Sequence, residues 1–150
     1  MRRVAIVLFL ILSAIAALHV FWGFGGRWPG ATTKELIDTV IGVPEMRVMP
    51  AAGITFAIAG LIFLGGVIAL FAGGLLPFRS RWMVQAATGV LTLVFLGRAT
   101  AGFWIAYHGS KASEPFATND VLLYSPLCLV IGGAFAALFI FYARKYKTTP

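Results

Sequence analysis

The sequence predicts an all-α membrane protein, a single integral membrane domain (1–150) built as a bundle of four transmembrane helices. Composition is the first indication, because 60% of the 150 residues are hydrophobic and only 11% are charged, unlike a soluble domain. The second is the presence of four apolar runs, at about 4–24, 51–76, 82–107 and 121–143. Each is long enough to cross a bilayer core about 30 Å thick, which takes roughly 20 helical residues.

Charge placement is the third indication, and it predicts topology. In three segments every charged residue is basic: the start of the chain, the connection between the second and third runs, and the end of the chain (Arg2, Arg3; Arg79, Arg81; Arg144, Lys145, Lys147). The other two connections hold all five acidic residues. Basic loops stay in the cytoplasm, so both termini are expected there. The net charge of +7 is therefore a topology signal rather than a nucleic-acid surface, with weak attraction to anionic membrane lipid.

The first run, which opens "MRRVAIVLFLILSAIAA", also has features of a cleaved signal peptide. Its start is basic, its centre is apolar, and Ala14 and Ala16 have the spacing of a cleavage site. We expect it to remain as the first spanning helix, because the apolar stretch reaches full spanning length and the charge alternation requires four helices.

The loop at 25–50 predicts a short amphipathic helix on the outer side. Thr32 and Glu35 have the spacing of a capping box, and one helical stripe is apolar (Leu36, Ile37, Val40, Ile41). We expect this helix to end at Gly42 and to lie on the membrane surface or cap the bundle. Before it, the glycines of "GFGG" allow the chain to turn back sharply.

Rows of small residues predict where the spanning helices pack, since helices in lipid approach closely at such rows. The rows are Gly65, Ala69 and Gly73; Gly97 and Ala101; Gly132 and Ala136; Gly133 and Ala137. They favour a compact bundle, and one row could instead serve a homodimer or a membrane-protein partner.

Arg98 is the most informative residue of the third run. It precedes Tyr107 by nine positions, about 13 Å along a helix. At that depth a charge costs at least about 2.5 kcal/mol unless it finds partners. Its side chain either reaches up to the interface or pairs inside the bundle, and the cost favours pairing. Asp120 is the candidate partner, with a solvated helix N-terminus as its alternative role.

Ser125 and Pro126 allow two starts for the fourth helix. Ser125 is its N-cap with Pro126 in the first turn, or the helix begins near Asp120 and Pro126 leaves the carbonyl of Leu122 free for a donor such as Arg98. Tyr124, four residues after Asp120, would share its helix face.

The remaining candidates lie around the end of the first run. His19 is expected near the depth that Arg98 reaches, either as a hydrogen-bonded structural residue or as part of a pocket. Tryptophans there belong first to the interfacial aromatic belt. The complete candidate ligand-binding set is His19, Trp22, Arg27, Arg98, Asp120 and Tyr124.

No resident cofactor or metal is predicted. His19 and His108 could in principle ligate haem, but no ligand motif accompanies them, and nothing has metal-ligand spacing. Cys128 is the single cysteine, which excludes an intrachain disulfide.

Three stretches carry a family resemblance: "LHVFWGFGGRWPG", "LGRATAGFW" and "PFATNDVLLYSPLCLVIGG". Together they resemble the bacterial domain-of-unknown-function (DUF) family 3995 of small four-helix membrane proteins. The resemblance implies a multi-pass protein of the bacterial cytoplasmic (inner) membrane, and lends no reaction. The chain differs in having Asn119 before Asp120, where the family pattern suggests arginine.

Three functions remain open from the sequence. The leading one is a non-catalytic protein with a polar pocket under the outer leaflet that binds a lipid, quinone or other amphipathic small molecule. The alternatives are an accessory or assembly subunit of a membrane complex, and a haem-binding or redox membrane enzyme.

Overall fold

A computed structural model describes residues 1–77, 80–109 and 111–147, and in these ranges all regular structure is helical. The elements are α1 (Arg2–Gly23), α2 (Thr33–Val40), α3 (Ala52–Ala72), α4 (Arg81–Tyr107), α5 (Phe116–Asn119), the π-helical turn η1 (Asp120–Tyr124) and α6 (Ser125–Lys147). Four segments are long and apolar enough to cross a membrane: α1, α3, α4 and the continuous unit of α5, η1 and α6. The all-α class and four helical segments of the length and apolarity needed to span are thus confirmed.

The second span is shorter than its apolar run, because α3 ends at Ala72 and not at residue 76. Gly74 adopts a positive φ of 72°, a conformation that glycine takes without strain. Its N–H donates to the carbonyl of Phe71, and the N–H of Leu75 donates to that of Leu70. This pair of bonds is a Schellman motif, which terminates the helix within the apolar stretch.

The fourth span begins earlier than its apolar run, at Phe116 and not at residue 121. The carboxylate of Glu114 accepts a hydrogen bond from the N–H of Thr118, one of the donors that a helix start leaves unpaired. The first turn, Phe116–Asn119, includes the polar residues Thr118 and Asn119, so hydropathy alone does not assign it to the span.

The expected turn after the first span is present at Gly25, whose φ is +86°. The N–H of Gly25 donates to the carbonyl of Trp22, and that of Gly26 to the carbonyl of Phe21. A side chain at Gly26 would come within 2.3 Å of the Phe21 ring. The turn therefore requires glycine at position 25, and a side chain at position 26 would displace the Phe21 ring.

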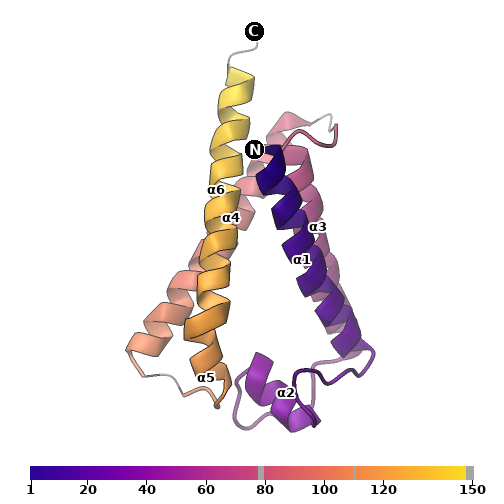
Figure 1. Cartoon of the computed structure of the whole chain (residues 1–150), viewed down its shortest axis with the longest axis vertical. Helices are drawn as coiled ribbons and strands as arrows, with labels where there is room; N and C mark the ends of the chain where they lie inside the picture. Colours follow the sequence, from indigo (N-terminus) through magenta and orange to yellow (C-terminus); the bar gives the residue numbers. More distant parts are fainter. Residues whose placement is uncertain (78–79, 110, 148–150) are drawn as a thin grey trace.

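The long helices form two pairs, α1 with α3 and α4 with α6 (Figure 1). Small residues lie within each pair: a Cβ on Gly73 would come within 2.4 Å of Ala5, and one on Gly132 within 2.7 Å of Leu96. Gly97 and Gly133 have open space around them. Helices thus pack closely at two of the predicted rows, those with Gly73 and with Gly132. They do not pack at Gly97 or Gly133 of the other two rows.

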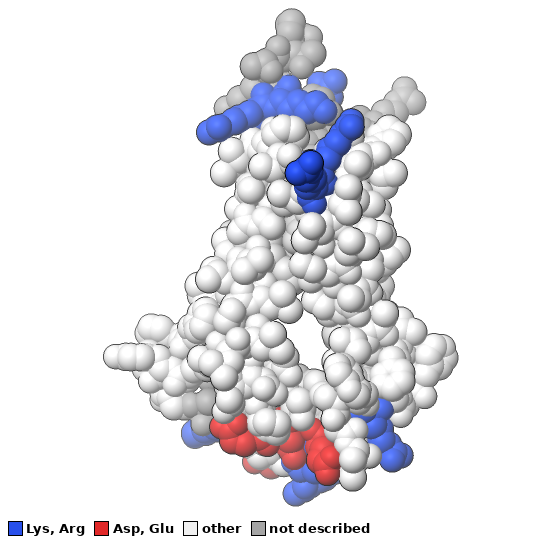
Figure 2. Space-filling view, in the orientation of Figure 1, with Lys and Arg blue, Asp and Glu red and all other residues white. Residues whose placement is uncertain are grey.

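The two pairs meet near the end that carries the N-terminus and the end of α6, and they diverge toward α2 (Figure 1). The space-filling view shows an opening between them near α2 (Figure 2). The sequence predicts a compact bundle, whereas the structure is open between the pairs at the α2 end. Gly73 and Gly132 each pack against the other helix of their own pair, and the contact between the pairs is made largely by an apolar cluster at the end away from α2.

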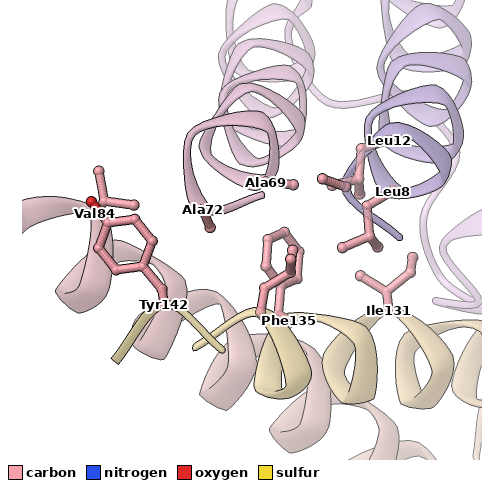
Figure 3. Packing of buried hydrophobic residues seen from close by; sticks show 10 residues of the cluster. Leu8, Leu12, Ala69, Ala72, Val84, Ile131, Phe135 and Tyr142 are labelled. Atoms are coloured by element: carbon pink, nitrogen blue, oxygen red, sulfur yellow. The ribbon is translucent and has the colours of Figure 1, made fainter. Parts of the chain in front are cut away.

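Large apolar side chains fill the region where the pairs meet. Leu8 and Leu12 of α1 face Ile131 and Phe135 of α6, next to Ala69 and Ala72 of α3 (Figure 3). Each of these six residues is at most 2% exposed. This cluster joins the two pairs.

The predicted amphipathic helix is α2, and its capping box is present. The hydroxyl of Thr32 accepts from the N–H of Glu35, whose carboxylate accepts from the N–H of Thr32. Leu36 and Ile37 are buried. Asp38 bonds to Lys34, and this contact lowers the pKa of the Asp38 carboxyl below its ordinary value.

Charges are segregated between the two ends of the molecule (Figure 2). Lys and Arg gather at the end where α1 begins and α6 ends, whereas Asp and Glu appear at the α2 end, together with further basic residues. Arg79, one of the residues behind the topology prediction, lies outside the described residues.

Candidate functional site

The candidate site is built around the π-helical turn η1. The N–H of Ser125 donates to the carbonyl of Asp120, five residues earlier, and Pro126 follows directly. Pro126 has no N–H to continue the α-helical ladder to Leu122, and a π-turn is one way to absorb that gap. Of the two starts that the sequence allows, the structure thus has the helix beginning before Pro126.

The π-turn changes which side chains share a face. In an α-helix, residues five apart lie about 140° apart around the axis. The wider i to i+5 bonding of a π-turn reduces this separation, so that both side chains can reach the same neighbouring helix. Asp120 and Ser125 therefore point the same way, toward α4.

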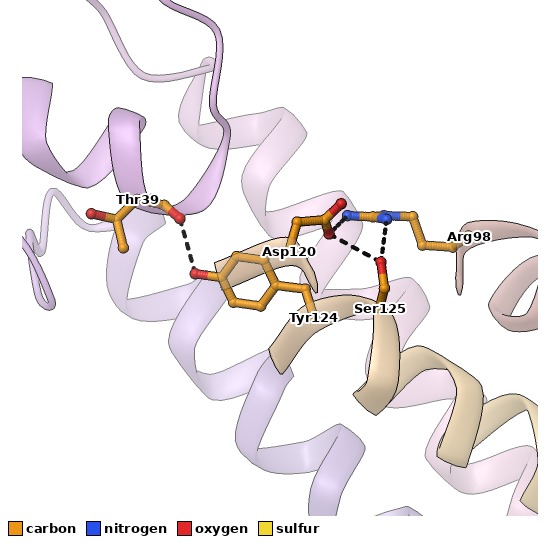
Figure 4. A network of polar contacts seen from close by, with 5 residues as sticks. All are labelled: Thr39, Arg98, Asp120, Tyr124 and Ser125. Atoms are coloured by element: carbon orange, nitrogen blue, oxygen red, sulfur yellow. Dashed lines mark hydrogen bonds and ion pairs between the residues drawn. The ribbon is translucent and has the colours of Figure 1, made fainter. Parts of the chain in front are cut away.

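Arg98 completes a triangle with these two residues (Figure 4). Its Nη2 lies 2.5 Å from Oδ1 of Asp120, and its Nη1 donates to Oγ of Ser125 at 3.5 Å. The Ser125 hydroxyl donates in turn to Oδ1 of Asp120 at 3.3 Å. The predicted pairing of Arg98 with Asp120 is present, and Ser125 is an additional member.

Burial within the triangle is uneven. Ser125 is fully buried, and the side chain of Asp120 is 11% exposed, whereas that of Arg98 is 41% exposed. The carboxylate therefore depends on its two donors, because a buried charge without partners is strongly destabilising. The Arg98 side chain keeps an accessible surface.

Gly102 gives the triangle its space. A Cβ at this position would lie 1.9 Å from Oγ of Ser125, 2.7 Å from Nη1 of Arg98 and 2.8 Å from Oδ2 of Asp120. Gly102 is one helical turn after Arg98 and so shares its face. Close approach of α4 to η1 thus requires glycine here.

Tyr124 does not join the triangle, which differs from the expected grouping. Its hydroxyl donates to the backbone carbonyl of Thr39 at 2.9 Å, and Figure 4 shows the side chain pointing toward α2 and away from Arg98. In a π-turn the fourth and fifth residues after Asp120 lie on either side of its direction, and here Ser125 is on the α4 side and Tyr124 on the α2 side. Tyr124 instead ties α2 to the fourth span.

The structure places the other candidates around the end of α1. Nδ1 of His19 lies 2.9 Å from the carbonyl oxygen of Ile15, and its ring lies 5.0 Å from that of Trp22. Nε1 of Trp22 donates to the carbonyl of Trp28 at 2.7 Å. Arg27 is exposed in the same loop. The candidate set therefore divides, with Arg98 and Asp120 together and His19 and Trp22 together.

His108, at the end of α4, has a similar arrangement to His19. Its Nδ1 lies 3.0 Å from the carbonyl oxygen of Trp104, and its ring packs against that side chain. Among the described residues, no group of three or more His, Cys, Asp or Glu side chains is placed to hold a metal ion.

A cavity of about 420 Å³ adjoins the triangle. It lies between α4, α5 and the segment after α2, and its lining is mostly apolar. Its charged lining residues are Arg98, Asp120 and Lys111. Two cations and one carboxylate leave this wall with one net positive charge.

Besides Ser125, three contributors were missed in the sequence. Lys111 belongs to a connection that the sequence does not place in space. Thr39 takes part through its backbone, which no side-chain pattern reports. Gly102 did carry a signal, because a glycine one turn from a membrane-embedded arginine marks space for that arginine's partners.

The comparisons with known proteins agree with the resemblance noted in the sequence. No curated protein and no solved structure matches the chain. A family model described as "Protein of unknown function (DUF3995)" matches residues 12–135, which include all of α3 and α4 and the whole Arg98 triangle. The chain therefore belongs to the DUF3995 family of proteins of unknown function.

Proposed function

We propose that this protein is a non-catalytic, multi-pass protein of the bacterial cytoplasmic membrane that binds an amphipathic small molecule beside Arg98. The observation that carries the proposal is the cavity of about 420 Å³, whose wall is mostly apolar and includes Arg98 and Asp120. Its size lies within the range of about 300–1,000 Å³ that is common for small-molecule sites. A polar group set into an apolar wall suits a ligand with a polar head and an apolar tail.

The placement of charged residues supports a site under the outer leaflet. The end formed by the start of α1 and the end of α6 carries Lys and Arg, and the acidic residues are at the α2 end (Figure 2). Because basic segments stay in the cytoplasm, the α2 end, the triangle and the cavity would face the outer side.

The charge of the wall favours an anionic or carbonyl head group. Ser125 and Asp120 take one N–H donor each from the Arg98 guanidinium, which has five and can donate further hydrogen bonds. Lys111 adds a second cation to the same cavity. Candidate ligands are a fatty acid, a lipid head group or a quinone.

Ligand binding is tested by native mass spectrometry of the purified protein in mild detergent, with oleate and decylubiquinone as probes. Arg98→Gln should weaken binding of oleate about tenfold, the usual value of a hydrogen bond to a charged group. Ala106→Phe should reduce binding of both probes, because a ring at this cavity-lining position fills the space without touching the triangle.

Ala57→Phe is the matched control, since Ala57 is exposed on α3 and does not line this cavity. It should bind both probes like the wild type. Equal binding by the Ala106 and Ala57 variants, or no binding of either probe to the wild type, contradicts the proposal. A stoichiometric protein partner in the same spectrum would favour the accessory-subunit alternative, and a Soret band lost in His19→Ala would favour the haem alternative.

A further inference from the structure

A second groove lies where the two helix pairs meet, at the end of the molecule opposite α2. It is a groove of about 250 Å³ between α1 and α6. Val4, Val7, Leu8 and Ile11 line it from α1, and Val130, Ile131 and Ala134 line it from α6, with Arg3 as its one polar lining residue.

The groove runs along the helix axes. The α1 lining residues extend from Arg3 to Ile11, eight positions that correspond to about 12 Å along a helix. Its floor includes Leu8 and Ile131, which are 2% and 1% exposed, whereas Val7 and Val130 on its sides are more than half exposed. Both helices are candidate membrane spans. In a bilayer, this long, shallow, apolar surface would therefore contact lipid acyl chains.

Charge distinguishes this groove from an ordinary lipid-facing surface. Arg3 is exposed in the first turn of α1 and has no hydrogen bond or ion pair with another described residue. Arg3 lies at the start of α1, the end of the molecule where Lys and Arg gather, whereas Asp and Glu appear at the opposite end (Figure 2). An unpaired guanidinium above an apolar groove is complementary to a phosphate above an acyl chain.

We propose that the α1–α6 groove binds an anionic phospholipid, with one acyl chain lying against Leu8 and Ile131 and its phosphate on Arg3. The site is separate from the cavity beside Arg98 and shares no lining residue with it. The lipid would cover the seam where the two helix pairs meet, in the leaflet on the side of the termini.

The test compares phosphatidylglycerol with phosphatidylcholine of the same acyl chains, titrated onto delipidated full-length protein and counted by native mass spectrometry. The wild type should retain phosphatidylglycerol preferentially. Arg3→Gln should reduce this preference about fivefold, the usual effect of one basic residue at an anionic lipid surface. The Arg2→Gln variant has the same net charge as Arg3→Gln, but Arg2 does not line the groove. This variant should therefore change the preference less than twofold.

The apolar part is tested by Val7→Trp, which fills the groove, against Leu10→Trp, which lies on the same helix outside it. The two residues are similarly exposed, at 54% and 59%, so neither substitution disturbs the core. Val7→Trp should reduce retention of both lipids, and Leu10→Trp should not. Equal loss of preference in the two arginine variants, which indicates general surface charge, or unchanged retention in Val7→Trp overturns the proposal.

Discussion

Gly102 sets how closely α4 approaches the π-helical turn, and this gives a prediction at the scale of one residue. A Cβ there would lie 1.9 Å from the hydroxyl of Ser125 and would also meet Arg98 and Asp120. Gly102→Ala should therefore destabilise the protein by about 1–3 kcal/mol, the usual cost of overpacking a well-packed site. The measurement is the midpoint of unfolding in a denaturing-detergent titration.

Gly97→Ala provides the control for that measurement. Gly97 is on the same helix, and a Cβ there meets nothing within 4 Å. Alanine is favoured over glycine in a helix by up to about 1 kcal/mol, so this variant should be as stable as the wild type or more stable. Similar destabilisation by both substitutions would show that helix α4 itself, and not the triangle, needs glycine.

At the residue scale, the sequence predicted one contact of the triangle, Arg98 with Asp120, and missed the two contacts that Ser125 makes. The depth of Arg98 required a partner, and Asp120 was the acidic residue at the right end of the neighbouring span. Ser125 was not identified as a side-chain partner, because α-helical spacing places it on a different side from Asp120. The same spacing placed Tyr124 with Asp120, and the π-turn reverses both assignments.

At the scale of elements, α2 is held by its capping box at one end and by the bond between Tyr124 and the carbonyl of Thr39 at the other. A helix of eight residues is marginal without such contacts. Thr32→Ala should cost about 1 kcal/mol of helix stability, because the N–H of Glu35 loses its acceptor. Amide hydrogen exchange across residues 33–40 should accelerate about fivefold.

Thr33→Ala tests whether that effect comes from the cap. Thr33 is the first residue of the helix, and the capping hydroxyl belongs to Thr32. Exchange in this variant should stay within twofold of the wild type. If the two variants exchange equally fast, the Tyr124 contact and the burial of Leu36 and Ile37 hold α2, and the capping box adds nothing measurable.

The elements were largely predictable and their ends were not. Hydropathy identified four spans because each must bury about 20 residues in lipid, and a capping pattern identified α2. Errors of four and five residues arose at α3 and at the fourth span. There a Schellman turn at Gly74 ended an apolar stretch early, and a polar turn from Phe116 extended a helix, so hydrogen bonding rather than hydropathy decided the boundary.

For the whole molecule, the sequence predicted close packing but not which helices pair. Small residues occur on several faces of α3, α4 and α6, and in lipid no burial from water selects among them. Gly73 and Gly132 pack within pairs, whereas a Cβ added at Gly97 or Gly133 would meet nothing within 4 Å. The divergence of the pairs toward α2 follows from this partition and could not be obtained from small-residue spacing alone.

The segregation of charge between the two ends predicts that the α2 end faces outward, and cysteine labelling in intact cells tests this orientation. In a Cys128→Ser background, which removes the half-buried native thiol, Glu45→Cys lies in the exposed segment after α2 and should react with a membrane-impermeant maleimide. Ser80→Cys lies in the connection before α4, toward the basic end, and should react only after the cells are opened. It leaves every basic residue in place, so the topology signal is intact. Labelling of Ser80→Cys in intact cells would place the Arg98 cavity on the cytoplasmic side, because Ser80 and that cavity lie toward opposite ends of α4.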